Sequence, residues 1–160
     1  MGILNVTPDS FSDGGLAYSP EAAADRAEQL VAEGADILDL GAESTRPGAE
    51  PIDAATELSR LLPAIAAVRR RLPDIPLSVD TYKAEVAAAC IAAGADVIND
   101  VEGGSHEADP TGSPMARTCA RLGCPLILMH RRKEPNYKDF WPEILAETSH
   151  LIQRARAAGL

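Results

Sequence analysis

Five short apolar runs in the sequence each end on a polar side chain that could hydrogen-bond a ligand. These side chains are Asn5, Asp39, Asp80, Asn99 and His130. In parallel βα folds, ligands gather at the carboxyl ends of the strands, where the loops converge. Any single Asp or Asn has about even odds of only starting a turn or capping the next helix. Their recurrence at all five runs favours a binding site.

Asp80 and Asn99 end two consecutive runs and differ in their hydrogen-bonding capacity. A carboxylate only accepts hydrogen bonds, whereas an amide both donates and accepts them. The pair therefore suits a flat heterocycle that presents N–H donors beside ring acceptors. It does not suit a phosphate group, because the Asp80 carboxylate would repel an anion.

Two loops that follow the first two runs supply different chemistry. Residues 5–15, NVTPDSFSDGG, are rich in turn-forming types and predict a polar loop around a lone Phe11. Residues 41–51, GAESTRPGAEP, offer the hydroxyl of Thr45 and the guanidinium group of Arg46. Such groups bind anions. The alternative for this second loop is a surface turn with a solvated arginine.

The elements that must position these residues repeat along the chain. The stretches AEGADILDL (32–40) and AAGADVIND (92–100) both read as a helix end, a Gly stop and a short apolar strand. Strands are predicted at Gly2–Val6, Asp36–Leu40, Pro76–Asp80, Asp96–Asn99 and Pro125–Met129. Helices are predicted from Ser19 and Pro20 onward and at Ile52–Leu72, Lys83–Ala93, Pro114–Leu122 and Trp141–Ala158. This pattern is typical of a parallel sheet covered by helices.

Five βα units in 160 residues fit two α/β folds. One is a flavodoxin-like doubly wound sheet, and the other is part of a (β/α)8 TIM barrel, which needs about 250 residues. The terminal stretch RARAAGL repeats the helix-end, Gly, aliphatic pattern that precedes a strand elsewhere. We therefore expect residues 1–160 to form the N-terminal part of a single TIM barrel, about its first five βα units.

Composition excludes several classes of partner. The net charge of −9 argues against nucleic acid, whose binding needs clustered Lys and Arg. No apolar run approaches the roughly 18 residues that cross a bilayer, and no export signal is visible. Cys90, Cys119 and Cys124 lack metal or redox spacing and are expected to be buried free thiols. These features suit a cytoplasmic protein.

Four stretches together resemble the dihydropteroate synthase family. They are MGILNVTPDSFSDGG, DLGAESTRPGAEP, LSVDTYKAEVA and ADVINDVEGG, and they occur in order along the chain. The resemblance implies a TIM-barrel transferase of folate biosynthesis, the target of sulfonamides. Such an enzyme condenses p-aminobenzoate with the pyrophosphate ester of 6-hydroxymethyl-7,8-dihydropterin, releasing pyrophosphate.

The resemblance also assigns roles to individual residues. It implies that Asp80 and Asn99 hold the pterin, with Met129 near its ring and Asp39 as a polar support beneath the site. It implies that Asn5 ligates Mg²⁺. The remaining assignments concern the two polar loops: Thr45 and Arg46 at the pyrophosphate, Phe11 and Pro47 at p-aminobenzoate, and Asp13 facing the developing cation.

Two rival functions stay open at this point. One is the pterin-binding barrel of a methyltetrahydrofolate methyltransferase, and the other is a non-enzymatic pterin-binding or scaffold protein. The family's later Asp-Pro-Gly, lysine and Arg-x-His motifs are absent from the chain, and Met1 aligns with an internal methionine. We therefore expect the chain alone to be inactive. The resemblance leaves open a homodimer of the longer protein.

Overall fold

The computed structural model describes residues 1–7, 19–44, 50–103, 113–132, 134 and 136–160. Within these residues, strands and helices alternate without exception, and every predicted element is present within two residues of its predicted bounds. The strands are β1 (Gly2–Asn5), β2 (Leu38–Gly41), β3 (Leu77–Asp80), β4 (Val97–Asp100) and β5 (Leu126–Leu128). The helices are α1 (Pro20–Ala32), α2 (Ala54–Arg71), α3 (Ala84–Ala92), α4 (Pro114–Leu122) and α5 (Phe140–Ala157).

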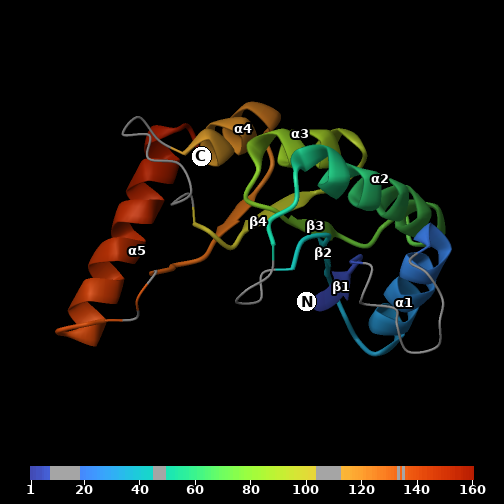
Figure 1. Cartoon of the computed structure of the whole chain (residues 1–160), viewed down its shortest axis with the longest axis horizontal. Helices are drawn as coiled ribbons and strands as arrows, with labels where there is room; N and C mark the ends of the chain where they lie inside the picture. The colour runs from blue at the N-terminus through green and yellow to red at the C-terminus, as the bar shows by residue number, and fades with distance from the viewer. Residues whose placement is uncertain (8–18, 45–49, 104–112, 133, 135) are drawn as a thin grey trace.

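The strands form one parallel sheet in the order β1-β2-β3-β4-β5. Helices α1 to α4 lie along one face of this sheet as a curved outer layer (Figure 1). A doubly wound sheet would reverse its strand order and carry helices on both faces. Strands in consecutive order, with helices covering only one face of the sheet, are the arrangement of a TIM barrel. This confirms the predicted fold class. In the described residues the sheet is open, because β1 and β5 are its two edges.

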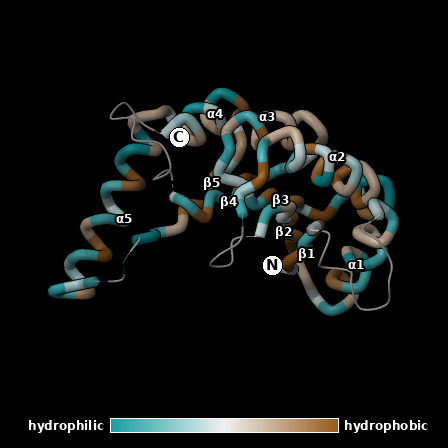
Figure 2. The backbone as a smooth tube through the Cα atoms, in the orientation of Figure 1, coloured by the Kyte–Doolittle hydropathy of each residue, from teal (hydrophilic) through white to brown (hydrophobic). Residues whose placement is uncertain are grey.

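The two faces of the sheet differ in chemistry because successive side chains alternate. Leu4, Leu40 and Val79 point toward the helices and are at most 1% exposed. Complete burial of such a side chain contributes about 1.5–3 kcal/mol. Ile3 and Ile127 point to the opposite face and are 66% and 39% exposed. Figure 2 shows that apolar residues recur along the sheet, interrupted by hydrophilic ones. The inner face is therefore free to carry polar groups.

Local signals in the sequence explain where the helices begin and end. Ser19 caps α1 by accepting a hydrogen bond from the Ala22 amide at 3.1 Å, as its position before Pro20 predicts. After α4, Gly123 has a φ of +68°, a left-handed conformation that favours glycine. The repeated Gly stops predicted from sequence are therefore confirmed.

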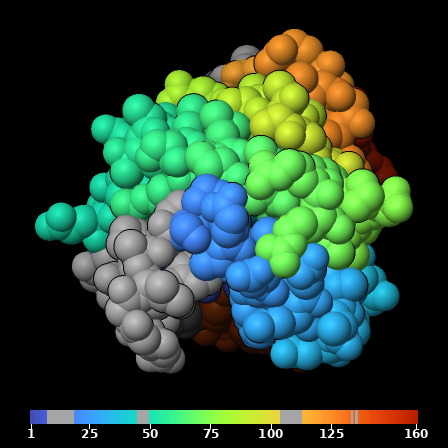
Figure 3. Space-filling model, turned by 90° about the vertical axis from the view of Figure 1, so that its right-hand side faces the viewer, coloured from blue at the N-terminus to red at the C-terminus, as the bar shows by residue number. Residues whose placement is uncertain are grey.

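The helical layer is continuous from α1 to α4. Figure 3, viewed from the side of α1, shows the successive helices packed against one another. Helix α5 differs, because several of its large apolar side chains face solvent. These are Phe140, Trp141, Leu145 and Ile152, which are 47%, 69%, 62% and 46% exposed.

The cysteines are buried and free, as predicted. Burial raises the pKa of the Cys90 thiol to about 12, so this side chain remains protonated at neutral pH. None of the described helices combines the length and apolar character needed to cross a membrane.

Candidate active site at the carboxyl edge of the sheet

Residues at or next to the carboxyl ends of four neighbouring strands form a single row across the inner face. Asn5 pairs with Gly41, Gly41 with Asp80, and Asp80 with Asn99 in the parallel register. Paired residues in a parallel sheet point to the same face, with strands about 4.8 Å apart. We call Asn5, Gly41, Asp80 and Asn99 the polar row. It places the predicted metal ligand on one side and the predicted pterin ligands on the other.

Gly41 leaves a space in the middle of the polar row. A Cβ atom at this position would lie 3.4 Å from Asn5 Oδ1 and 3.6 Å from Asp80 Oδ2. Both oxygens therefore border the volume that a side chain would occupy. Oxygen atoms are the ligands that Mg²⁺ prefers, and Mg²⁺ usually takes few protein ligands and keeps waters or substrate phosphates. Asn5 fits that role, and no group of three His, Cys, Asp or Glu residues in the described chain offers a complete metal cage.

Asp39 lies one row deeper than the polar row. Strand β2 continues to Gly41, so Asp39 lies inside the strand instead of near its end and is only 6% exposed. Its Oδ2 accepts a hydrogen bond from Asn99 Nδ2 at 3.0 Å. Strand β3 separates these two residues along the sheet. Their contact reflects a curved sheet, in which side chains from alternate strands meet in one layer.

Two buried polar atoms on this deeper layer have no hydrogen-bond partner among the residues that the structure describes. They are Asp39 Oδ1 and Ser78 Oγ, and their residues are register neighbours on β2 and β3. Buried polar atoms are rarely left unpaired, so such atoms indicate a bound water or ligand group. Ser78 was not singled out from sequence, because a serine inside an apolar strand carries no signal of its own. The floor of the site is thus polar as well as its rim.

The environment of Asp80 changes its protonation. Burial, followed by the negative charges of Asp39, Glu57, Asp100 and Glu43, raises the pKa of Asp80 to about 7. A carboxyl group with this pKa is held close to its ionisation point at neutral pH. A ligand that donates N–H bonds would favour its ionised form, whereas an anion would meet several negative charges. These surroundings favour a ligand that donates hydrogen bonds over an anion at this position.

The other predicted site residues divide into two groups. Met129 follows β5 with the same alternation as Ile127, so it belongs to the inner face, where it is 42% exposed. The remaining residues lie outside the described part of the chain: Phe11, Asp13, Thr45, Arg46 and Pro47.

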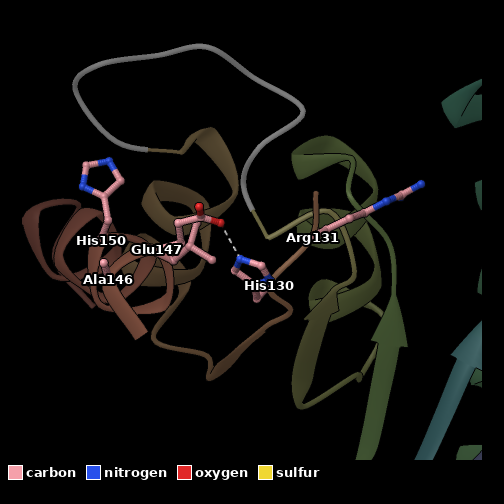
Figure 4. Close-up of a pocket in the computed structure, with 6 residues that line it drawn as sticks. His130, Arg131, Ala146, Glu147 and His150 are labelled. Atoms are coloured by element: carbon pink, nitrogen blue, oxygen red, sulfur yellow. Dashed lines mark hydrogen bonds and ion pairs between the residues drawn. The ribbon is translucent and has the colours of Figure 1, made fainter. Parts of the chain in front are cut away.

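A separate pocket of about 340 Å³ lies between α5 and the segment after β5. His130 Nε2 lies 2.6 Å from Glu147 Oε2 there, while Arg131 points away from the pair (Figure 4). Hydrogen bonds from Arg132 and then His130 lower the pKa of Glu147 to about 2. This carboxylate is therefore an anion that ties α5 to the end of β5. His130, expected at the ligand edge, has a partner on α5 instead.

A parallel sheet of the TIM-barrel type, with polar side chains at the carboxyl ends of its strands, is typical of a ligand-binding α/β protein. The chain belongs to the pterin binding enzyme family, whose model matches residues 1–160. It is 46% identical over its whole length to dihydropteroate synthase from Bacillus subtilis and 44% identical to that from Clostridium beijerinckii. It covers 54% and 57% of these proteins, so the chain spans about half the length of the curated relatives it matches.

Solved structures give the same result. Dihydropteroate synthase from Xanthomonas albilineans with 4-aminobenzoic acid superposes with a TM-score of 0.88 at 43% identity, covering 100% of this chain and 56% of that one. The enzyme from Clostridium difficile, solved in the presence of pteroic acid, gives 0.87 at 42% identity, with 99% and 59% covered. The resemblance to dihydropteroate synthases drawn from four sequence stretches is confirmed.

Proposed function

We propose that the protein containing this chain is a dihydropteroate synthase. It would condense p-aminobenzoate with (7,8-dihydropterin-6-yl)methyl pyrophosphate to give dihydropteroate and pyrophosphate. The observation that carries the proposal is the adjacent pair of Asp80 and Asn99 in the polar row, above a polar floor. Small-molecule substrates, no nucleic acid and a cytoplasmic location are part of the same proposal.

The hydrogen-bonding capacity of this pair matches one edge of a pterin. Ionised Asp80 accepts hydrogen bonds from the pterin's amino and ring N–H groups. Asn99 donates one hydrogen to Asp39, and within the described part of the chain its Oδ1 and second N–H remain for the ligand. Asp39 thereby fixes which way the Asn99 amide faces. Met129 would pack on the ring from the neighbouring strand.

The chemical step needs charge stabilisation at two points. When pyrophosphate leaves, the pterin methylene becomes positively charged, and the amine of p-aminobenzoate attacks it. By family resemblance, Asp13 would face the developing cation, Thr45 and Arg46 would bind the departing anion, and Phe11 and Pro47 would wall the p-aminobenzoate pocket. Mg²⁺ held by Asn5 would supply further charge to the leaving group. No protein nucleophile is required.

The open sheet supports the proposal that this chain is part of a larger barrel. The inner face exposes Ile3, Ile127 and Met129, which a closed barrel would bury. We propose that residues 1–160 form the N-terminal part of this barrel and that further βα units complete the site.

The rival functions fit less well. A methyltetrahydrofolate methyltransferase expels no pyrophosphate, so it gives no reason for the anion-binding stretch ESTRPG at residues 43–48. A scaffold protein gives no reason for a carboxyl group with a pKa of about 7 at the ligand edge.

The longer protein should form dihydropteroate and pyrophosphate in equal amounts from the two substrates. A coupled pyrophosphate assay with chromatographic detection of dihydropteroate measures both products. Methyl transfer from methyltetrahydrofolate without pyrophosphate release would establish the first rival. Pterin binding with neither reaction would establish the second.

Binding should also be ordered. If Asn5 shares Mg²⁺ with pyrophosphate, p-aminobenzoate should bind well only when both are present, and chelation with EDTA should abolish its binding. Calorimetric titration of p-aminobenzoate into the longer protein, with and without Mg²⁺ and pyrophosphate, measures this. Equal affinity in both conditions would contradict the metal assignment. A sulfonamide should follow the same order, since dihydropteroate synthase from Yersinia pestis has been solved with a sulfonamide drug.

A further inference from the structure

A buried ion-pair network lies beside the polar row. Lys83 Nζ contacts the carboxylates of Glu57, at 2.6 Å, and of Glu43. The Tyr82 hydroxyl donates to Glu43 Oε1 at 2.8 Å. The side chains of Lys83, Glu43 and Glu57 are only 15%, 11% and 1% exposed. We call these three residues the Lys83 clamp.

The clamp joins two glutamates, one after β2 and one in α2, that the folded chain brings close together. Glu43 lies two residues beyond β2, and Glu57 lies in the first turn of α2. Thr45 to Pro47 lie between them in sequence. One ammonium group therefore holds a carboxylate on each side of the segment that is proposed to bind the anion. Arg60 of α2 adds a further tie by donating to the Ala42 carbonyl at 2.9 Å.

The Lys83 side chain stays charged near neutral pH. Burial by itself would lower the pKa of Lys83, but hydrogen bonds to Glu43 and Glu57 outweigh it and raise this pKa above its ordinary value. The lysine is therefore an ammonium group that offsets two buried carboxylates. Buried ion pairs of this kind are often no more stabilising than an apolar replacement, so their contribution to stability alone explains them poorly.

We propose that Lys83, with Glu43 and Glu57, is a positioning device for the pyrophosphate side of the site. Glu43 and Glu57 flank the proposed anion-binding stretch in sequence, and by holding both of them the clamp lowers the entropy cost of placing binding groups between them. Within the described residues it makes no hydrogen bond to Asp80 or Asn99, so its direct effect should fall on pyrophosphate and p-aminobenzoate. Its carboxylates act on the pterin side through the pKa of Asp80, which Glu57 and Glu43 help to raise. This inference rests on the proposed function.

The first test is Lys83→Met in the longer protein. Affinity for inorganic pyrophosphate in the presence of Mg²⁺ should fall about 10- to 100-fold, the range expected when binding groups are misplaced. When both proteins are compared on the high-pH plateau, where Asp80 is ionised, affinity for 6-hydroxymethylpterin should change less than about twofold, which is within normal scatter for a site left intact. Lys83→Arg should restore part of the loss. Lys138→Met, at an exposed lysine before α5, is the matched control and should change neither affinity.

Because Lys83→Met leaves Glu57 buried without its cation, a second variant separates positioning from stability. Lys83→Met combined with Glu57→Leu removes both charges and should recover much of the thermal stability. Its pyrophosphate affinity should stay low. Recovery of both stability and affinity, or equal losses of pyrophosphate and pterin affinity in either variant, would overturn the inference. A native longer protein that binds pterin but not pyrophosphate would overturn the proposed function itself.

Discussion

Asp80→Asn should weaken pterin binding by roughly 5- to 150-fold in the longer protein. The substitution puts an amide where a partly buried carboxylate accepts hydrogen bonds, so one ligand N–H can face another donor. An unmet buried donor costs about 1–3 kcal/mol, which corresponds to that range of affinity. Calorimetry with 6-hydroxymethylpterin measures the change. Asp74→Asn, at an exposed carboxylate outside the site, is the control and should leave the affinity unchanged.

The pH dependence of the same titration adds a second criterion. Burial and neighbouring acids raise the pKa of Asp80 to about 7. If the pterin needs the ionised carboxylate, binding below this pH must first release a proton. Affinity should then fall by up to about tenfold for each pH unit below 7 and level off above it. The Asp80→Asn variant should lack this slope. A native protein whose affinity is flat from pH 5 to 8, or a variant with unchanged affinity, would remove Asp80 from the pterin site.

Residues 1–160 expressed alone should self-associate and show no turnover. Strands β1 and β5 are unpaired edges, and such edges promote association between chains. Exposed Ile3 and Met129 on the inner face and Trp141 on α5 add apolar surface that favours the same outcome. A chain extended by roughly 100 residues, enough for the remaining barrel units, should be monodisperse and active.

Light scattering and the pyrophosphate-release assay on the two chains decide between these outcomes. The control is to co-express residues 1–160 with the remaining units as a separate chain, which should reduce association if open edges cause it. A monomeric and active 160-residue protein would contradict the proposal that more barrel is needed. It would also show that five strands suffice for the chemistry.

Most of the fold could be predicted because the signals are local. Apolar strands, Gly stops and Ser or Asp caps each depend on a few adjacent residues, and the structure places every element where these signals do. The adjacency of Asp80 and Asn99 could also be predicted, because consecutive parallel strands present their carboxyl ends at one edge. The choice of barrel over doubly wound sheet needed strand order, which residue patterns only suggest.

The floor of the site and the Lys83 clamp could not be predicted in the same way. The residue pattern put Asp39 near the end of a strand, and only the family resemblance put it beneath the site. Strand β2 extends through Gly41, and a shift of one or two residues decides whether a side chain lies at the rim or beneath it. Glu57 occupies a buried position on α2, although a glutamate in an amphipathic helix ordinarily indicates solvent. Its partner Lys83 lies 26 residues away, so only the folded chain shows why the charge is tolerated there.

The gap at Gly41 has a consequence for how this site can change by mutation. Every single-base missense change in a glycine codon adds side-chain atoms, and at this position they would enter the space between Asn5 and Asp80. An alanine methyl group would meet its neighbours only at ordinary contact distances of 3.4 and 3.6 Å, and Gly41 has no positive φ that alanine would strain. Folding would therefore tolerate the change while the room for a ligand shrank. A mutational scan that measures protein abundance would score Gly41→Ala as neutral. Only a selection that depends on ligand binding would detect its effect.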